Sequence, residues 1–278
     1  MITINGNQYK LCLFDTNALS NFLINPKDWI NYFDKKFSIS KTIISYSVFS
    51  LSELWFRQEL FEKYINFFSI FPSVILDGYN SIFEKEISNY YKNTKINPIV
   101  IAPCAIKDSN LTPLERLKKV IENSGFILKS NDWKKNREEI LNGIIDLKKN
   151  YPSKKDNYNL DEIEDFNFLA TTSQIIMRKK EFAEKIIKNK KEINLKNFPS
   201  IITTSYVVFY KFYPDNRKPL LSDVFDIIIS SLLPYVDIVL TEGNLCDIIK
   251  KIKLKHKFLN SLECYSLKDV KKEIVTFV

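Results

Sequence analysis

The sequence predicts an α/β protein in which short buried strands alternate with amphipathic helices. Short apolar runs recur along the chain, and segments with apolar residues at helical spacing follow several of them. The first run, at residues 10–14, ends abruptly in Asp15, and the polar pair Thr16 and Asn17 comes next. In open α/β sheets, ligands bind just beyond the carboxyl ends of the strands. We therefore expect Asp15 to be placed for chemistry.

An aspartate after a strand also serves as a turn former or a helix cap, so Asp15 alone does not decide between structure and function. Either Thr16 or Asn17 is expected to cap a helix that begins at Ala18. The functional interpretation gains weight only if other acids occupy matching places in the fold.

The remaining elements follow from periodicity and from turn residues. Further strands are expected at residues 42–46, 73–76, 99–102, 236–242 and 262–265. Helices are expected at residues 18–33 with an interruption at Pro26, and at 47–65, 79–91, 162–176, 179–189, 201–213 and 245–252. Residues 111–150 have a helical pattern rich in lysine and glutamate, and residues 151–161 are typical of a linker.

Glu53 is the second candidate acid. Ser47 or Ser50 is a natural cap for the helix that follows the second strand, which places Glu53 in the first two turns of that helix. A helix that follows a parallel strand begins at the carboxyl edge of the sheet, where Asp15 is also expected. The alternative is that the helix dipole alone favours an acid here.

The third group of acids lies near residues 219–242. Ser222 is a natural N-cap, so Asp223 and Asp226 are expected in the first turn of a helix and on one face of it. They are either complements of the helix dipole or ligands of a divalent cation that relieves the repulsion between carboxylates. The next strand ends in Thr241 and Glu242, and Glu242 is the expected site member.

Composition narrows the chemistry. The chain has 278 residues, 45% of them hydrophobic, and a formal charge of +8, which suits a polyanionic partner such as nucleic acid. Lysine, asparagine and isoleucine are abundant throughout, so the charge by itself carries little weight. With His256 as the only histidine and five glycines, a histidine-rich zinc site and a glycine-rich phosphate loop are disfavoured. Oxygen ligands favour Mg²⁺ or Mn²⁺.

Targeting and cysteine patterns indicate a cytoplasmic protein that does not enter a membrane. No apolar stretch approaches the ~18 residues of a membrane span, and the N-terminus lacks a secretory signal. The four cysteines are expected to be reduced and mostly buried, because they are scattered and form no Cys-x-x-Cys pair. They are Cys12, Cys104, Cys246 and Cys264.

The acid-bearing segments together resemble the PIN-domain nucleases. The similar segments are residues 14–17 (FDTN), 47–54 from the serine to Glu53, 226–231 (DIIISS) and 237–241 (DIVLT). The family often has an aspartate two residues after the threonine, where this chain has Gly243, so Glu242 or Asn244 takes that place. The resemblance covers about residues 10–102 and 200–266. It implies a single PIN-like domain over residues 1–278, with a three-layer α/β/α fold, a mainly parallel sheet and a helical elaboration at about 103–199.

The resemblance implies a metal-dependent endonuclease that hydrolyses phosphodiester bonds in RNA, with single-stranded or structured DNA as the less favoured substrate. Asp15 and Asp226 are the implied direct ligands of Mg²⁺ or Mn²⁺, with Glu53 on a ligand water or a second ion. Asp223 and Glu242 complete the acidic set, and Thr16, Asn17 and Thr241 orient it. Family members commonly act as toxins restrained by an antitoxin protein, or in RNA processing, and a homodimer is a further expected form of assembly.

Two alternatives stay open. A catalytically inactive PIN-like module that binds nucleic acid or a protein is favoured by Gly243 and by the long helical middle region. A phosphatase with Asp15 as nucleophile is disfavoured, because that chemistry usually needs a second acid at the position of Asn17.

Overall fold

The structure is a computed structural model that describes residues 1–4, 6–90, 92, 94, 96–102, 110–123, 133–154, 157–183 and 193–277. Within these residues, seven strands form one sheet. The strands are β1 (Ile2–Ile4), β2 (Asn7–Phe14), β3 (Thr42–Ser47), β4 (Ser73–Leu76), β5 (Ile99–Ile101), β6 (Ile238–Thr241) and β7 (Glu263–Ser266). The five strands expected after the first are all present, each within about two residues of its expected bounds at either end.

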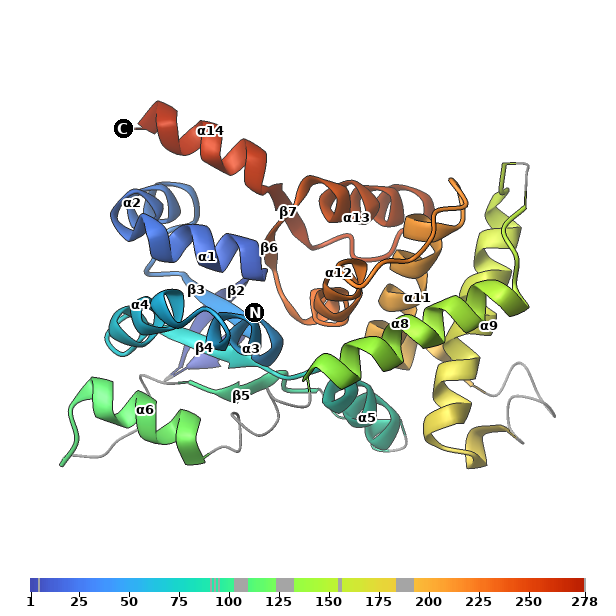
Figure 1. The fold of residues 1–278 in the computed structure, drawn as a ribbon, viewed down its shortest axis with the longest axis horizontal. Coiled ribbons are helices and arrows are strands. Elements are labelled where there is room, and N and C mark those ends of the chain that lie inside the picture. Colours follow the sequence, from blue (N-terminus) through green and yellow to red (C-terminus); the bar gives the residue numbers. More distant parts are fainter. Residues whose placement is uncertain are drawn as a thin grey trace.

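The sheet is mainly parallel, with the order β5-β4-β3-β2-β6-β7. Strands β2, β3, β4, β6 and β7 run parallel, whereas β5 is antiparallel to β4 and β1 is antiparallel to β2. The chain moves outward from β2 to β3 and β4, then returns to place β6 on the other side of β2 and β7 beyond it (Figure 1). The order of the strands therefore reverses between β2 and β6, which is where open α/β sheets bind ligands.

Helices pack against both faces of the sheet (Figure 1). On one face lie α1 (Thr16–Ile24), α2 (Pro26–Phe37), α3 (Val48–Trp55), α4 (Gln58–Phe68), α6 (Pro113–Asn123) and α14 (Leu267–Phe277). On the other face lie α5 (Tyr79–Asn89), α8 (Trp133–Asn150), α9 (Leu160–Arg178), α11 (Pro199–Phe212), α12 (Asp223–Ser230) and α13 (Gly243–His256). Short 3₁₀ turns, η2 (Leu195–Asn197) and η3 (Leu233–Tyr235), precede α11 and β6.

Strand β2 joins the two layers because its side chains alternate between the two faces. Leu11 and Leu13 belong to the core beneath α11 and α12, whereas Cys12 and Phe14 belong to the core beneath α1 and α4. All four are completely buried. A continuous apolar run therefore marks a strand covered on both faces, as the sequence predicts.

Two elements were not expected from the sequence. β1 forms a hairpin with β2 in which Ile2 faces Tyr9, and Gly6 has a φ of +80° in the turn. At the other end of the chain, the Ser266 hydroxyl accepts a hydrogen bond from the Asp269 N–H (3.2 Å) and donates one to the Asp269 carboxylate (2.7 Å), which starts α14. The expected helix at 179–189 lies outside the described residues from 184 onward.

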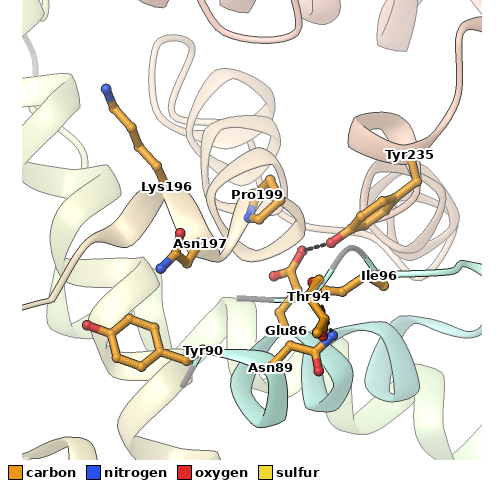
Figure 2. Close-up of a pocket in the computed structure, with 9 residues that line it drawn as sticks. All are labelled: Glu86, Asn89, Tyr90, Thr94, Ile96, Lys196, Asn197, Pro199 and Tyr235. Carbon is orange, nitrogen blue, oxygen red and sulfur yellow. Dashed lines mark hydrogen bonds between the residues drawn. The ribbon is translucent and has the colours of Figure 1, made fainter. Parts of the chain in front are cut away.

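Helix α11 begins at Pro199, and a buried acid caps it. The Glu86 carboxylate accepts hydrogen bonds from the Ser200 N–H (2.7 Å) and the Tyr235 hydroxyl (2.6 Å) through the same oxygen. Burial raises the pKa of Glu86 to about 7. Figure 2 shows this carboxylate at the side of a cavity of about 190 Å³ that Tyr90 and Asn197 also line.

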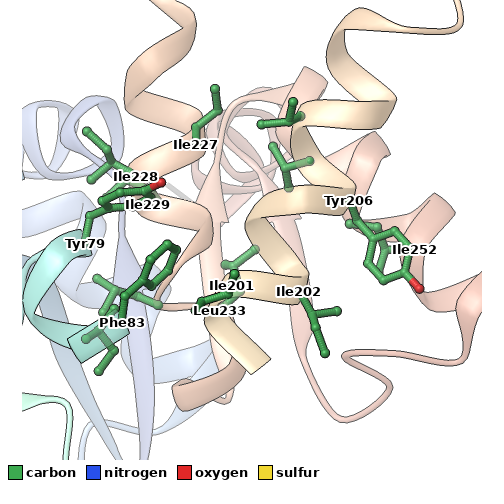
Figure 3. Packing of buried hydrophobic residues seen from close by; sticks show 14 of the residues in the cluster. Tyr79, Phe83, Ile201, Ile202, Tyr206, Ile227, Ile228, Ile229, Leu233 and Ile252 are labelled. Carbon is green, nitrogen blue, oxygen red and sulfur yellow. The ribbon is translucent and has the colours of Figure 1, made fainter. Parts of the chain in front are cut away.

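Helix α11 is buried on nearly every side and organises its half of the core. Ile201 and Val207 are completely buried, and Ile202 packs in the same cluster (Figure 3). Facing side chains from α5 and α12, among them Phe83 and Ile228, close the space around it. Because α11 runs directly into the loop before α12, this packing fixes where the acids of α12 lie.

None of the helices in the described part of the chain combines the length and the apolar character that crossing a membrane requires.

Candidate functional site

Asp15 lies at the carboxyl end of β2 and is 7% exposed. Its Oδ1 accepts a hydrogen bond from the Ala18 N–H (2.6 Å), and its Oδ2 accepts one from the Glu242 N–H (3.2 Å). The first bond makes Asp15 the N-cap of α1, which begins at Thr16. The expectation that Thr16 or Asn17 caps this helix is therefore wrong, because Asp15 itself has the extended backbone of a cap residue.

The groups that hydrogen-bond Asp15 are neutral, and its charge is poorly compensated. Burial raises the pKa of Asp15 to about 6, although the hydrogen bond from Ala18 opposes that rise. The negative charges of Asp226 and Glu242 also raise the pKa of Asp15, so both acids lie within electrostatic range of it. A buried carboxylate among other carboxylates favours either a proton or a cation.

The end of β6 supplies the second part of the site. Thr241 is fully buried beside Asp15, and its hydroxyl helps to keep the pKa of Asp15 from rising further. The Thr241 Oγ1 nevertheless makes no well-formed hydrogen bond with any described atom. Glu242 is exposed, and its carboxylate accepts a short hydrogen bond from the Asn17 side-chain amide of α1. The strand itself ends at Thr241, so Glu242 is the N-cap residue of α13.

Glu53 approaches the same place from α3. Ser47 caps this helix through a hydrogen bond from the Ser50 N–H (3.0 Å), as the sequence predicts. Burial raises the pKa of Glu53 to about 7. A hydrogen bond from the Thr16 hydroxyl and the positive charges of Arg57 and Arg137 oppose that rise, whereas the negative charge of Asp15 adds to it. Thr16 therefore contacts Glu53, and Asn17 contacts Glu242.

The two acids of α12 are paired with a lysine of α11. The Lys211 side chain, which is 3% exposed, forms a short ion pair with the Asp226 carboxylate, and its Nζ lies 3.2 Å from Oδ1 of Asp223. Asp223 also pairs with Arg217 (2.8 Å) and accepts a hydrogen bond from the Leu220 N–H (2.9 Å). Asp223 is thus held by two cations and a backbone group, which is the environment of a structural acid.

Ser222 does not act as the expected side-chain cap of α12. Its backbone is already helical, and its hydroxyl makes no capping bond. In the turn before α12, the Asp223 carboxylate instead accepts a hydrogen bond from the Leu220 N–H. By contrast, Asp237 has the structural role expected of it: its carboxylate accepts a hydrogen bond from the Leu11 N–H (2.9 Å) and pairs with the N-terminal amine (2.8 Å).

Taken together, the carboxylates converge on the carboxyl ends of β2 and β6, but they do not form a ready metal centre. Among the described residues, no three side chains of histidine, cysteine, aspartate or glutamate lie close enough to hold one ion. The donor chemistry fits a hard divalent cation, because Asp15 and Glu53 offer carboxylate oxygens and receive hydrogen bonds from neutral groups. Arg57 and Arg137 lie within electrostatic range of Glu53 and supply part of the positive charge there. The obstacle is Lys211, whose ammonium group already neutralises Asp226.

Sequence reasoning missed Lys211 and Arg217, because lysines of a basic chain are most simply read as exposed. The available signal was the setting of Lys211, which lies in an otherwise apolar and aromatic run at residues 206–213. A lysine at a core position needs an acid as its partner, since an unpaired buried charge is costly. The nearest acids along the chain after it are Asp215, Asp223 and Asp226.

Comparison with protein-family models, with curated proteins and with solved structures finds no match to this chain. The class of the protein therefore rests on its fold and on this group of acids.

The raised pKa of Glu53 predicts a dependence of stability on pH. Because the pKa of Glu53 is about 7 in the folded chain and near 4.5 when unfolded, the folded state holds more protons between these values. The free energy of unfolding therefore falls as pH rises from about 4.5 to 7, and then levels off. Glutamine does not titrate, so we expect the free energy of unfolding of Glu53→Gln to fall less than that of wild type over this pH range. The difference should be on the order of 1–2 kcal/mol, a figure that takes the partial exposure of the side chain into account.

Urea unfolding of both proteins at pH 5 and pH 7.5 measures this difference. Glu59→Gln on α4 is the matched control, since Glu59 is exposed and its pKa is lowered by Lys63. An equal pH response in wild type and Glu53→Gln would contradict the assignment of the effect to Glu53.

Proposed function

We propose that this protein is a divalent-metal-dependent nuclease of PIN type that hydrolyses phosphodiester bonds in RNA. The observation that carries the proposal is the meeting of acids from separate parts of the chain at the point where the strand order reverses. Asp15 follows β2, Glu53 comes from α3, Asp226 from α12 and Glu242 from the end of β6. The mutual effects on the pKa values of Asp15 and Glu53 support their sharing one electrostatic environment.

Asp15 and Glu53 would hold the ion, with Asp226 as a third ligand once its pair with Lys211 is loosened. A bound Mg²⁺ or Mn²⁺ supplies a water of lowered pKa and positive charge against the scissile phosphate. The Asn17 amide donates a hydrogen bond to the Glu242 carboxylate, and the Thr16 hydroxyl hydrogen-bonds Glu53. Asp223 stabilises this arrangement by holding Lys211 and Arg217.

The net charge of +8 supports a polyanionic substrate, and lysine and aromatic side chains suit single-stranded RNA better than a duplex. We extend the proposal to a role as a toxin or defence nuclease that an inhibitor protein restrains. We also propose that the protein assembles as a homodimer.

The pair between Lys211 and Asp226 favours a second candidate, a PIN-like module that binds nucleic acid without cleaving it. In that case Lys211 replaces the metal ion permanently. A fluorescent single-stranded RNA incubated with the protein and Mg²⁺, Mn²⁺ or EDTA separates the two candidates. Metal-dependent cleavage supports the nuclease, whereas binding without cleavage in any metal supports the module.

The pKa values of the two acids predict how cleavage varies with pH. Asp15 and Glu53 must be ionised to hold a cation, and their pKa values are raised to about 6 and about 7. We expect the cleavage rate to rise about tenfold per pH unit between pH 6 and 7, to rise more steeply below pH 6, where both acids carry a proton, and to level off above pH 7. A higher Mn²⁺ concentration should shift the rise to lower pH, because the cation competes with the proton. A rate that is flat from pH 5 to 8 would contradict this prediction.

A further inference from the structure

Two cysteines that are 18 residues apart in the sequence meet between α13 and β7. Cys246 lies in the first turn of α13, and Cys264 lies on β7, where it pairs with Val239 of β6. Their sulfur atoms are 2.8 Å apart, with the Cys264 thiol donating to the Cys246 sulfur. A disulfide bond has a sulfur–sulfur distance of about 2.05 Å. The two sulfurs therefore need to approach by only about 0.8 Å to form the bond.

The surroundings of this pair favour oxidation. The hydrogen bond from Cys264 lowers the pKa of Cys246 against the opposing effect of burial, and the positive charge of Lys250 lowers it further. The same hydrogen bond raises the pKa of Cys264. The pair thus gives up its first proton more readily than an isolated thiol, and the hydrogen bond lets the two sulfurs share the negative charge. Cys246 is buried, but Cys264 is partly exposed, so a small oxidant has a route to the pair.

Cys12 provides a contrast within the same protein. It is completely buried in β2, and burial raises the pKa of its thiol well above the usual value. A buried neutral thiol is a poor nucleophile and is oxidised slowly. Cys104 lies outside the described residues.

We propose that Cys246 and Cys264 form a reversible disulfide bond when the protein meets a peroxide. In the first step, the Cys246 thiolate, which the oxidant reaches past the partly exposed Cys264, attacks one peroxide oxygen, the O–O bond breaks, and the hydroxide that is released takes a proton and leaves as water. This step produces a sulfenic acid. The Cys264 sulfur then attacks the sulfenic sulfur of Cys246, and its proton leaves with the sulfenic hydroxyl as a second water. Two thiols are oxidised and one hydrogen peroxide is reduced to two waters.

The bond would fasten the first turn of α13, which begins next to Glu242, to the edge strand β7. The proposal stands apart from the nuclease function, because it concerns thiols that lie outside the group of acids.

The test uses the full chain and hydrogen peroxide. After exposure, free thiols are blocked with N-ethylmaleimide in denaturant, and the protein is digested without reduction and analysed by mass spectrometry. We expect a linked peptide that joins residues 246 and 264, the loss of two thiols out of four, and full reversal by dithiothreitol. The pair should react with hydrogen peroxide at least about ten times faster than Cys12 does.

Cys264→Ser should abolish the linked peptide and leave Cys246 as a sulfenic or sulfinic acid. Cys12→Ala is the matched control and should form the link as the wild type does. The proposal is overturned if wild-type Cys246 and Cys264 are both recovered with N-ethylmaleimide, or if the link that forms includes Cys12 or Cys104 instead.

Discussion

Asp15→Asn is expected to lower metal-dependent RNA cleavage about 1,000-fold while leaving the fold intact. The loss follows because a single preorganised charge at a site of this kind contributes about 10²–10³ in rate, and Asp15 is the most buried acid beside the proposed ion. The fold should persist because asparagine keeps the oxygen that accepts the Ala18 N–H and is as good an N-cap as aspartate. The hydrogen bond from the Glu242 N–H is lost, at a cost of about 1–3 kcal/mol. Initial rates and urea unfolding on the same preparations measure the two effects separately.

Asp237→Asn is the matched control for Asp15→Asn. Asp237 also flanks a central strand and also binds backbone N–H, but it lies at the amino end of β6, at the opposite edge of the sheet. We expect it to keep cleavage within about twofold of wild type, since it contacts none of the proposed ligands. If both variants lose activity together, the effect of Asp15→Asn arises from the fold and not from the site.

Strands β3, β4 and β6 could be predicted because each is covered on both faces, so that its sequence is a short run of mostly apolar residues. The run Ser73–Leu76 was predicted with both of its ends correct for this reason. The order of the strands could not be read in the same way. It depends on which strands exchange hydrogen bonds, and nothing in the residues of β6 says that β2 is its neighbour.

The acids could be picked out one by one because each stands at the boundary of an element, but their partners could not. Asp223 and Asp226 look equivalent in the sequence, three residues apart at a helix start. In the structure, Asp223 pairs with both Lys211 and Arg217, whereas Asp226 pairs with Lys211 alone. Asp223 is therefore a structural acid, and Asp226 is the one whose charge acts on Asp15. The difference comes from Lys211 and Arg217, which precede α12 and reach it only because α11 is packed in the core. The contact between Cys246 and Cys264 likewise needs β7 to lie beside β6.

Lys211→Met is expected to lower the free energy of unfolding by about 3 kcal/mol, because it leaves the partly buried Asp226 without a cation and leaves Asp223 with Arg217 alone. Methionine fills nearly the same space as the lysine stem, so packing is largely kept. Lys10→Met is the matched control. Lys10 pairs with Glu263 at the surface, where both side chains are more than 40% exposed, and its loss should cost at most about 1 kcal/mol.

Mn²⁺ connects this stability effect to the site. If the ammonium group of Lys211 holds the place of a metal ion at Asp226, Lys211→Met should bind Mn²⁺ more tightly than wild type. Saturating Mn²⁺ at 100 times the dissociation constant should then restore about 2.7 kcal/mol of stability. Titration calorimetry and urea unfolding with and without Mn²⁺ measure both quantities. A variant that is destabilised and gains nothing from Mn²⁺ would mean that Lys211 is a permanent partner of Asp226, and the non-cleaving module would become the better description of the protein.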